Sequence, residues 1–465
     1  MAAIRSSHSI DEIVIAQSHR NQNLYDAIRA YVPIAIDHVV RRATSHVPIS
    51  ELNEERFFFS RMESEDDLVK HAEYQACVKE LLHDRQVSNQ IGVLVGDNSY
   101  RERTPNVSGL MRQLIYMGLA RGEYAFNQEY FERQYNVFEH SYYSDFITYD
   151  VIAPLQNFLL SSSIELSEDL EISPLAADDV DPHRSSTEIV VSEEVGFGQP
   201  CAVRSKFQIR KVIGGDAPIN IEESEKDRER FAQTAARVDE VVDALRLFKV
   251  ETVYYSAIIF RTSRWLFRDE RVFPTRMRDP IPLTYDRGDE WLDSFKQFWQ
   301  NLQSEGVKRR EYIGVAVRRF GYALERGLME DRVVDLMVAA EAIFLSDAGS
   351  VKYRGELQYR LALRAAFLMG TDNASRIVIY DYFRQAYKIR SSVVHGSAKT
   401  IQPKNNLDEP ITLKQFLGII QVYVRYALCK VIERAATLEP QEKVFDWENL
   451  VLTGRNSISS DAEHG

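Results

Sequence analysis

Cysteine, glycine and proline are scarce in this chain of 465 residues, which has 3 Cys, 21 Gly and 14 Pro. Cys77, Cys201 and Cys429 lie far apart, and three cysteines are too few for a disulfide framework or a cysteine-built zinc site. Such usage fits a reducing cytoplasm. The low glycine and proline content argues against a collagen-like, low-complexity or turn-rich all-β protein, and it favours a chain with much helix.

Long apolar runs are absent as well. The sequence has no uncharged apolar stretch of roughly 18 residues or more, so we expect no membrane-spanning helix and no membrane partner. The first residues, MAAIRSSHSIDEIVIAQ, lack the apolar segment of a secretory signal. We therefore expect a cytoplasmic protein.

Positive charge is also in deficit overall, with 57 Lys and Arg against 69 Asp and Glu and a formal net charge of −12. This balance argues against a protein coated with nucleic acid. The charge is uneven, however. Residues 161–200 are strongly acidic, whereas residues 306–400 carry sixteen Lys and Arg against ten Asp and Glu. A local basic surface is therefore expected inside an acidic molecule.

The hydrophobic pattern predicts a multidomain α+β chain. We expect a mainly helical N-terminal region over 1–160, an α+β region over 161–300, a helical bundle over 301–440 and a polar tail over 441–465. In the first region, one helical face carries Phe131, Tyr135, Phe138, Tyr142 and Phe146, which we interpret as a core stripe because acidic neighbours would repel a nucleic acid.

Strands are predicted in the middle region at Thr187–Val191, Lys206–Ile213 and Val253–Phe260, with a long helix over 231–248 and mostly antiparallel pairing. Gly196-Phe197-Gly198 is expected to be a turn and not a phosphate loop.

The third region reads as five amphipathic helices with short connections. The fourth helix stops at Gly396, and the fifth opens with the capping box Thr412-x-x-Gln415.

Histidine is rare, and His395 is the only one between His183 and His464. Arg390 precedes it by five residues, which separates the two side chains by about 140° on a regular helix. Because Gly396 follows His395, we expect the helix to end or distort there, and a loosened last turn would let the imidazole approach the arginine.

Such a pair suits RNA cleavage without a metal ion or a cofactor. An imidazole with a pKa near ~6.5 can take a proton from a ribose 2′-hydroxyl, and a guanidinium can hold the adjacent phosphate. The products would carry 2′,3′-cyclic phosphates, and DNA would be spared because it lacks the hydroxyl. A two-fold dimer would supply a second imidazole as the acid. The plainer alternative is that Arg390 and His395 only complement the helix dipole.

Three blocks of sequence stand in a fixed order in the third region: Asp331–Leu336 followed by Ala339–Phe344, then Leu357–Gly370, and then Arg390–Gly396. On these blocks, residues of about 305–438 resemble the HEPN superfamily, in particular its Apea-like branch. The resemblance implies a helical bundle, a homodimer and a metal-independent ribonuclease site with Arg390 and His395 as the catalytic residues. Ser391 stands where many active members carry Asn, Asp or His, and its hydroxyl would hydrogen-bond a phosphate or orient the arginine.

Glu341 lies on an apolar helix, where an ionised carboxylate needs a partner, so we expect a salt bridge to Arg390 or another basic residue. Apea-like relatives include anti-phage effectors that arrest growth by cleaving RNA. By analogy the resemblance implies host defence, with residues 1–300 as a sensor or substrate-selecting module and a triggering or neutralising protein as a further partner to test for.

Two other functions remain open at this stage. The bundle could be a non-catalytic module for dimerisation or protein docking, or Arg390 and His395 could bind a phosphate ligand without turnover. Two basic clusters could guide RNA, although solvated charged faces are the more common reading. The clusters are Arg261, Arg264, Arg268, Arg271, Arg276 and Arg278 interleaved with Trp265, Phe267 and Phe273, and Lys308-Arg309-Arg310 with Arg318-Arg319.

Overall fold

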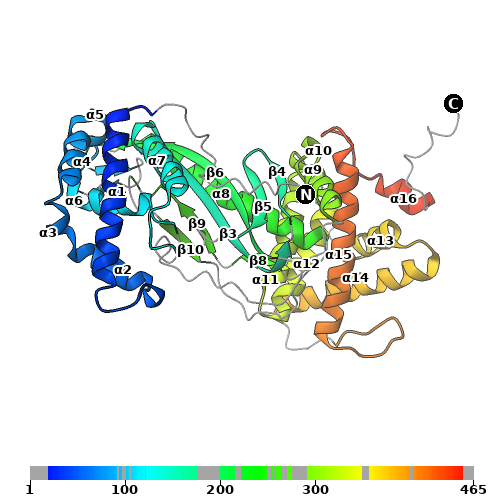
Figure 1. The fold of residues 1–465 in the computed structure, drawn as a ribbon. Helices are drawn as coiled ribbons and strands as arrows, with labels where there is room; N and C mark the ends of the chain where they lie inside the picture. The colour runs from blue at the N-terminus through cyan, green and yellow to red at the C-terminus, as the bar shows by residue number, and fades with distance from the viewer. Residues whose placement is uncertain are drawn as a thin grey trace.

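The structure is a computed structural model of the chain. The structure describes residues 19–91, 94–96, 101–103, 106–120, 122–160, 162–175, 199–214, 221–248, 253–255, 257–263, 265, 270–274, 291–347, 356–396 and 402–453. Within these residues the chain is mixed α+β, with many helices and an antiparallel sheet in the middle of the sequence. Helices of the N-terminal region lie at one end of the molecule, the sheet lies in the centre, and the C-terminal helices lie at the other end (Figure 1).

Helices dominate the N-terminal end. They are α1 (Gln22–Ala43), α2 (Glu54–Glu63), α3 (Glu65–Leu68), α4 (Ala72–His83), α5 (Arg85–Ser88), α6 (Val107–Leu114) and α7 (Gln128–Tyr143), with the 3-10 turns η2 (Ile49–Glu51) and η3 (Ile115–Met117). Asn21 begins α1, because its side chain accepts a hydrogen bond from the Leu24 N–H.

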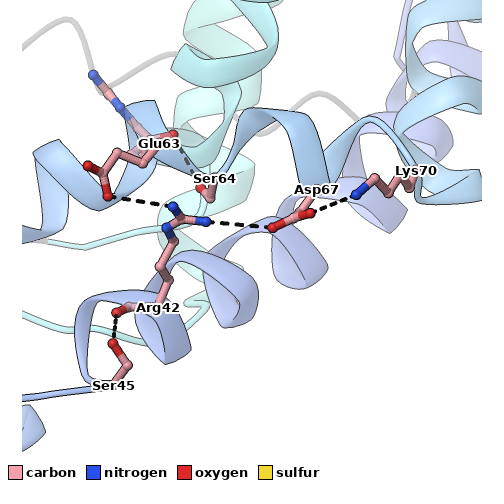
Figure 2. A network of polar contacts seen from close by, with 7 residues as sticks. Arg42, Ser45, Glu63, Ser64, Asp67 and Lys70 are labelled. Atoms are coloured by element: carbon pink, nitrogen blue, oxygen red, sulfur yellow. Dashed lines mark hydrogen bonds and ion pairs between the residues drawn. The ribbon is translucent and has the colours of Figure 1, made fainter.

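Arg42, in the last turn of α1, joins this helix to the two that follow (Figure 2). Its guanidinium lies 3.6 Å from a carboxylate oxygen of Glu63 on α2 and 3.6 Å from one of Asp67 on α3. Lys70 Nζ approaches Asp67 to 2.9 Å. These side chains are largely exposed, so each pair adds little stability, and the network mainly fixes how the chain turns after α1.

The aromatic stripe of α7 is a core stripe, as predicted. Phe131, Tyr135, Phe138 and Tyr142 are all buried. The expectation that Phe146 continues the stripe is wrong. The helix ends at Tyr143, Ser144 takes an extended conformation, and Phe146 begins strand β3 with 47% of its surface exposed.

The strands are antiparallel in every pairing that the structure describes. The larger sheet has the order β10-β9-β3-β6-β5-β4, with β8 also paired to β3, and a small sheet has the order β2-β1-β7. The strands are β1 (Leu94–Gly96), β2 (Arg101–Arg103), β3 (Phe146–Leu160), β4 (Ile164–Ser167), β5 (Leu170–Pro174), β6 (Gln199–Arg210), β7 (Val212–Ile213), β8 (Tyr254–Tyr255), β9 (Ala257–Arg261) and β10 (Glu270–Pro274).

The predicted strands at Lys206–Ile213 and Val253–Phe260 are present as β6–β7 and β8–β9. The long strand β3 lies inside the segment that the sequence predicts to be mainly helical. The predicted strand Thr187–Val191 and the turn at Gly196 lie outside the described residues.

Helix α8 (Ile221–Phe248) connects the sheet to the C-terminal helices. Its Phe231 ring lies 5.0 Å from that of Phe207 on β6 and 5.1 Å from that of Phe260 on β9, so this end of α8 rests on the sheet. At its other end, Arg425 of α15 donates to the carbonyl oxygens of Leu247 and Phe248, which caps the C-terminus of α8.

All five helices predicted in the third region are present, at the end of the molecule opposite the N-terminal helices (Figure 1). Helix α12 contacts each of the other four. The helices of this region are α9 (Leu292–Gln303), α10 (Glu305–Lys308), α11 (Glu311–Glu325), α12 (Met329–Phe344), α13 (Leu357–Met369), α14 (Asn373–Val394), α15 (Leu413–Ala436) and α16 (Trp447–Thr453).

The capping box that opens α15 is formed as predicted: the Thr412 hydroxyl accepts from the Gln415 N–H, and the Gln415 side chain accepts from the Thr412 N–H. One helix of the described chain, α15 itself, is long and apolar enough to cross a membrane, but half of that apolar window is buried among other elements. Such burial is typical of a core helix.

The first half of the predicted tail is part of the folded structure. Helix α16 contacts α13, and its Trp447 is only 7% exposed, with the Arg364 guanidinium 5.3 Å from the ring centroid. Residues 454–465, the end of that segment, lie outside the described residues.

Candidate functional site

Arg390 lies on α14 and points toward α12. Its Nη2 is 3.4 Å from Oε2 of Glu341, and both side chains are about one quarter exposed. The salt bridge that the sequence predicts for Glu341 is therefore made with Arg390. Burial raises the pKa of the Glu341 carboxyl, and the Arg390 guanidinium opposes that rise.

The ion pair does not use every hydrogen-bond donor of the Arg390 guanidinium. The Nε atom is buried, and no residue of the described chain hydrogen-bonds to it. The Tyr387 ring lies under the guanidinium, with the Cζ atom 5.9 Å from the ring centroid. Glu341 and Tyr387 thus fix the position of Arg390 from two sides while a quarter of its side chain still faces solvent.

His395 stands at the end of α14, as predicted, and is exposed. Its N–H donates to the Ser391 carbonyl oxygen at 3.1 Å, so the helical hydrogen bonding continues up to His395. Helix α14 ends at Val394, and His395 is its C-cap, with φ of −90° and ψ of 5°. Gly396 follows with a φ of 62°, in the left-handed region that favours glycine. The helix therefore ends at His395 and Gly396, as predicted.

In the part of the chain that the structure describes, no hydrogen bond or ion pair joins the His395 imidazole to Arg390, Glu341 or Ser391. Ser391 is half-buried and contributes its carbonyl oxygen to the backbone bond with His395. Within one chain, therefore, the guanidinium is bound to Glu341 and not to the imidazole.

Tyr387 was not singled out from the sequence. The signal that could have found it is its spacing of three residues before Arg390, because residues three apart on a helix are neighbours on its surface.

Most side chains of the first basic cluster lie outside the described residues. Within the described part, Arg261 and Trp265 are buried, which removes Trp265 as a platform for base stacking. In the second cluster, Arg310 is buried and donates to the carbonyl oxygens of Glu439 and Glu442. The other cations of the second cluster are largely paired with carboxylates: Lys308 with Glu240, Arg309 with Glu305, and Arg319 with Asp335.

A cavity of about 550 Å³ lies away from this site, between α8, α9 and the strand β4. Its two cations are already engaged, because Arg237 binds Asp169 and Lys308 binds Glu240. Among the described residues, no group of three or more His, Cys, Asp or Glu is placed to hold a metal ion.

Comparison of the chain with known protein families, with curated proteins and with solved structures finds no match. The function of the site therefore has to be inferred from its own residues.

Proposed function

We propose that the protein is a metal-independent endoribonuclease whose C-terminal helices form an HEPN-like bundle, with Arg390 and His395 as the catalytic residues. The observation that supports this most directly is the combination at the end of α14: an exposed histidine, and five residues before it an arginine held in place by Glu341. The expected cytoplasmic location and the role in defence belong to the same proposal.

In the proposed reaction the His395 imidazole takes the proton of a ribose 2′-hydroxyl. The 2′-oxygen attacks the adjacent phosphorus, the bond to the 5′-oxygen of the next nucleotide breaks, and that oxygen receives a proton. The Arg390 guanidinium stabilises the negative charge that develops on the non-bridging oxygens. One product ends in a 2′,3′-cyclic phosphate and the other begins with a 5′-hydroxyl.

In a homodimer, the imidazole of one copy would reach the arginine of the other, whereas within one chain the two side chains do not contact each other by a hydrogen bond. A second copy would place its own imidazole near the first arginine, and it would also provide the acid that protonates the leaving oxygen. The exposure of His395, its place at a helix end and the partial exposure of Arg390 suit a site completed by a partner subunit.

The decisive experiment incubates the purified protein with total RNA in the presence of a chelator. We expect fragments with 2′,3′-cyclic phosphate ends from the wild type and none from His395→Ala. His83→Ala is the matched control, because His83 is also exposed and also ends a helix, α4. If His395→Ala cleaves RNA as the wild type does, or if the chelator stops the reaction, the proposal is wrong.

A second candidate function is a non-catalytic dimerisation or docking module. It is favoured by two exposed side chains one turn apart on α15, Val422 at 49% and Tyr426 at 47% exposure. In that case Val422→Asp would separate the subunits in solution, and His395→Ala would have no effect on any measured property. Binding of a phosphate ligand without turnover is the remaining alternative, and the RNA incubation would show it as binding without new ends.

A further inference from the structure

Three arginines of the hairpin formed by α13 and α14 each lie over an aromatic ring. The pairs, with the distance from Cζ to the ring centroid, are Arg376–Phe367 (4.5 Å), Arg384–Tyr380 (5.5 Å) and Arg390–Tyr387 (5.9 Å). The third pair contains the arginine of the candidate site. Exposed or half-buried cations on aromatic rings are groups that can bind phosphates and stack on bases.

One further ring on this hairpin is open to solvent. Tyr359 of α13 is 54% exposed and contacts the Tyr380 ring edge to face, with centroids 6.1 Å apart and planes at 80°. Next to it, Arg384 is exposed, and the Gln358 side chain donates to the Arg384 carbonyl oxygen, which ties the two helices together. Tyr359 and Arg384 therefore form an accessible ring and an accessible cation on neighbouring helices.

The hairpin is strongly basic although the whole molecule is acidic. Helices α13 and α14 carry six Lys and Arg, and their single carboxylate is Asp381. Arg364 is buried and pairs with Asp347, Arg360 approaches the same carboxylate, and Arg390 pairs with Glu341. The remaining three cations, Arg376, Arg384 and Lys388, are exposed or half-buried and form no ion pair with the described residues. The resulting field attracts a polyanion.

The pairs follow one side of α14 toward the candidate site. At 100° per residue, positions 376, 380, 384, 387 and 390 fall within an arc of about 120°. From Arg376 to Arg390 the helix rises about 21 Å. At the ~3.4 Å spacing of a stacked strand, that length accommodates about six nucleotides.

We propose that this side of the hairpin, defined by Tyr359, Phe367, Arg376, Tyr380, Arg384 and Tyr387 and called here the α13–α14 face, binds single-stranded RNA and delivers it to Arg390. The inference rests on the proposed ribonuclease function and adds the form of its substrate. Single strands are favoured over duplexes because unpaired bases can stack on Tyr359, whereas the bases of a helix are already stacked on one another.

The test measures binding by fluorescence anisotropy, with wild-type protein and a labelled 2′-O-methyl oligouridine of about 12 nucleotides. The methyl group blocks the attacking oxygen, so binding is separated from cleavage. We expect Tyr359→Ala to weaken binding roughly five- to a hundredfold, the usual effect of losing one stacking ring. Arg384→Ala should weaken binding and reduce the slope of log affinity against log salt by about 0.7, one phosphate contact on a single strand.

Two variants of the N-terminal region serve as matched controls: Phe59→Ala removes an exposed ring from α2, and Arg133→Ala removes an exposed cation from α7. Both should bind the oligonucleotide as the wild type does. If Tyr359→Ala and Arg384→Ala also bind as the wild type does, or if the controls lose as much affinity, the inference is wrong. It is also wrong if Tyr359→Ala changes the oligomeric state and leaves binding intact, because the face would then be a protein interface.

The outcome separates the inference from the proposed function. If the wild type, Tyr359→Ala and Arg384→Ala all cleave RNA at the same rate, the protein is a nuclease but the α13–α14 face does not bind its substrate. Binding that depends on Tyr359 and Arg384, in a protein that never makes cyclic-phosphate ends, would retain the face as an RNA-binding surface and reject the nuclease.

Discussion

At the scale of single residues, the pair of Glu341 and Arg390 holds a guanidinium at a half-buried position between two helices. Glu341 acts in the proposed site as a positioning residue, because its carboxylate binds the guanidinium of Arg390. Its removal should affect the rate at which bound RNA is cleaved more than the binding of RNA. A misplaced catalytic group costs far more in a transition state than in a ground state.

We therefore expect Glu341→Gln to lower kcat for RNA cleavage about ten- to a hundredfold with little change in KM. The free energy of unfolding should change by less than about 1 kcal/mol, since the ion pair is partly exposed. Single-turnover kinetics and urea unfolding measure the two quantities. Glu330→Gln, on an exposed position of the same helix, is the control, and an equal loss of kcat in both variants would contradict the positioning role.

Asp243 gives a residue-scale prediction that does not depend on the proposed function. This carboxyl is buried between α8 and α11, where burial raises its pKa from 3.8 to about 7, Arg246 opposes the rise, and Asp239 and Glu325 add to it. Because the raised pKa means that the folded state binds the proton more tightly, Asp243 contributes stability at acid pH. That contribution is lost as the pH rises from about 4 through about 7.

The stability of Asp243→Asn relative to the wild type should accordingly increase as the pH rises from about 4 to about 7. Urea unfolding at several pH values measures the difference. Asp169→Asn is the control, because the hydrogen bonds from Arg237 lower the pKa of Asp169 to about 2, below this window, so its stability difference from the wild type should stay constant across the window. A constant difference between wild type and Asp243→Asn across the window would show that Asp243 is ionised throughout.

At the scale of elements, Gly306 shows how closely α10 and α15 pack, and Gly418 provides an exposed comparison. A Cβ atom on Gly306 of α10 would collide with the Ala435 carbonyl oxygen of α15, whereas Gly418, on the exposed side of α15, has open space around it. Gly306→Ala should lower the free energy of unfolding by about 1–3 kcal/mol through overpacking. Gly418→Ala should raise it by about 0.5–1 kcal/mol through better helix propensity.

Chemical unfolding of both variants checks this pair of opposite effects. If Gly306→Ala is neutral, then α10 does not approach α15 as closely as the structure has it.

The helices of the C-terminal region were predictable because their signals are local. The capping box Thr412-x-x-Gln415 and the apolar spacing within each helix are properties of a few consecutive residues. Strand β3 was not predictable in the same way. Phe146 follows Tyr142 at helical spacing, and what makes it a strand is its pairing with β6 and β9, far along the chain.

In the candidate site, too, one contact was predictable from the sequence and one was not. The contact between Glu341 and Arg390 was predictable, because an ionised carboxylate on an apolar helix needs a cation. The relation of Arg390 to His395 was not. It depends on the conformation of the chain where α14 ends, at His395 and Gly396, which local sequence signals do not specify.

At the scale of the whole molecule, the proposed function requires two copies of the chain, with a combined mass of about 107 kDa from subunits of 53.6 kDa. Subunit mixing tests whether the arginine of one copy works with the histidine of the other. Arg390→Ala and His395→Ala should each be inactive alone. Co-expressed in equal amounts, they should recover measurable activity of at most about a quarter of the wild-type rate, because half of the dimers place one intact arginine opposite one intact histidine and lack the second imidazole as the acid.

Light scattering gives the mass, and the cyclic-phosphate assay gives the rate. Activity of the mixture no higher than that of either variant alone, in verified heterodimers, would contradict a site shared between two copies.

Helix α8 runs from the sheet to the C-terminal helices and spans about 42 Å over its 28 residues. A continuous α-helix behaves as a stiff rod, since bending it stretches the hydrogen bonds of its backbone. Phe231 couples one end to β6 and β9, and Arg425 clamps the other to α15. A displacement of the strands therefore reaches α15 as motion of the rod itself, so α8 mechanically links the sheet to the C-terminal helices.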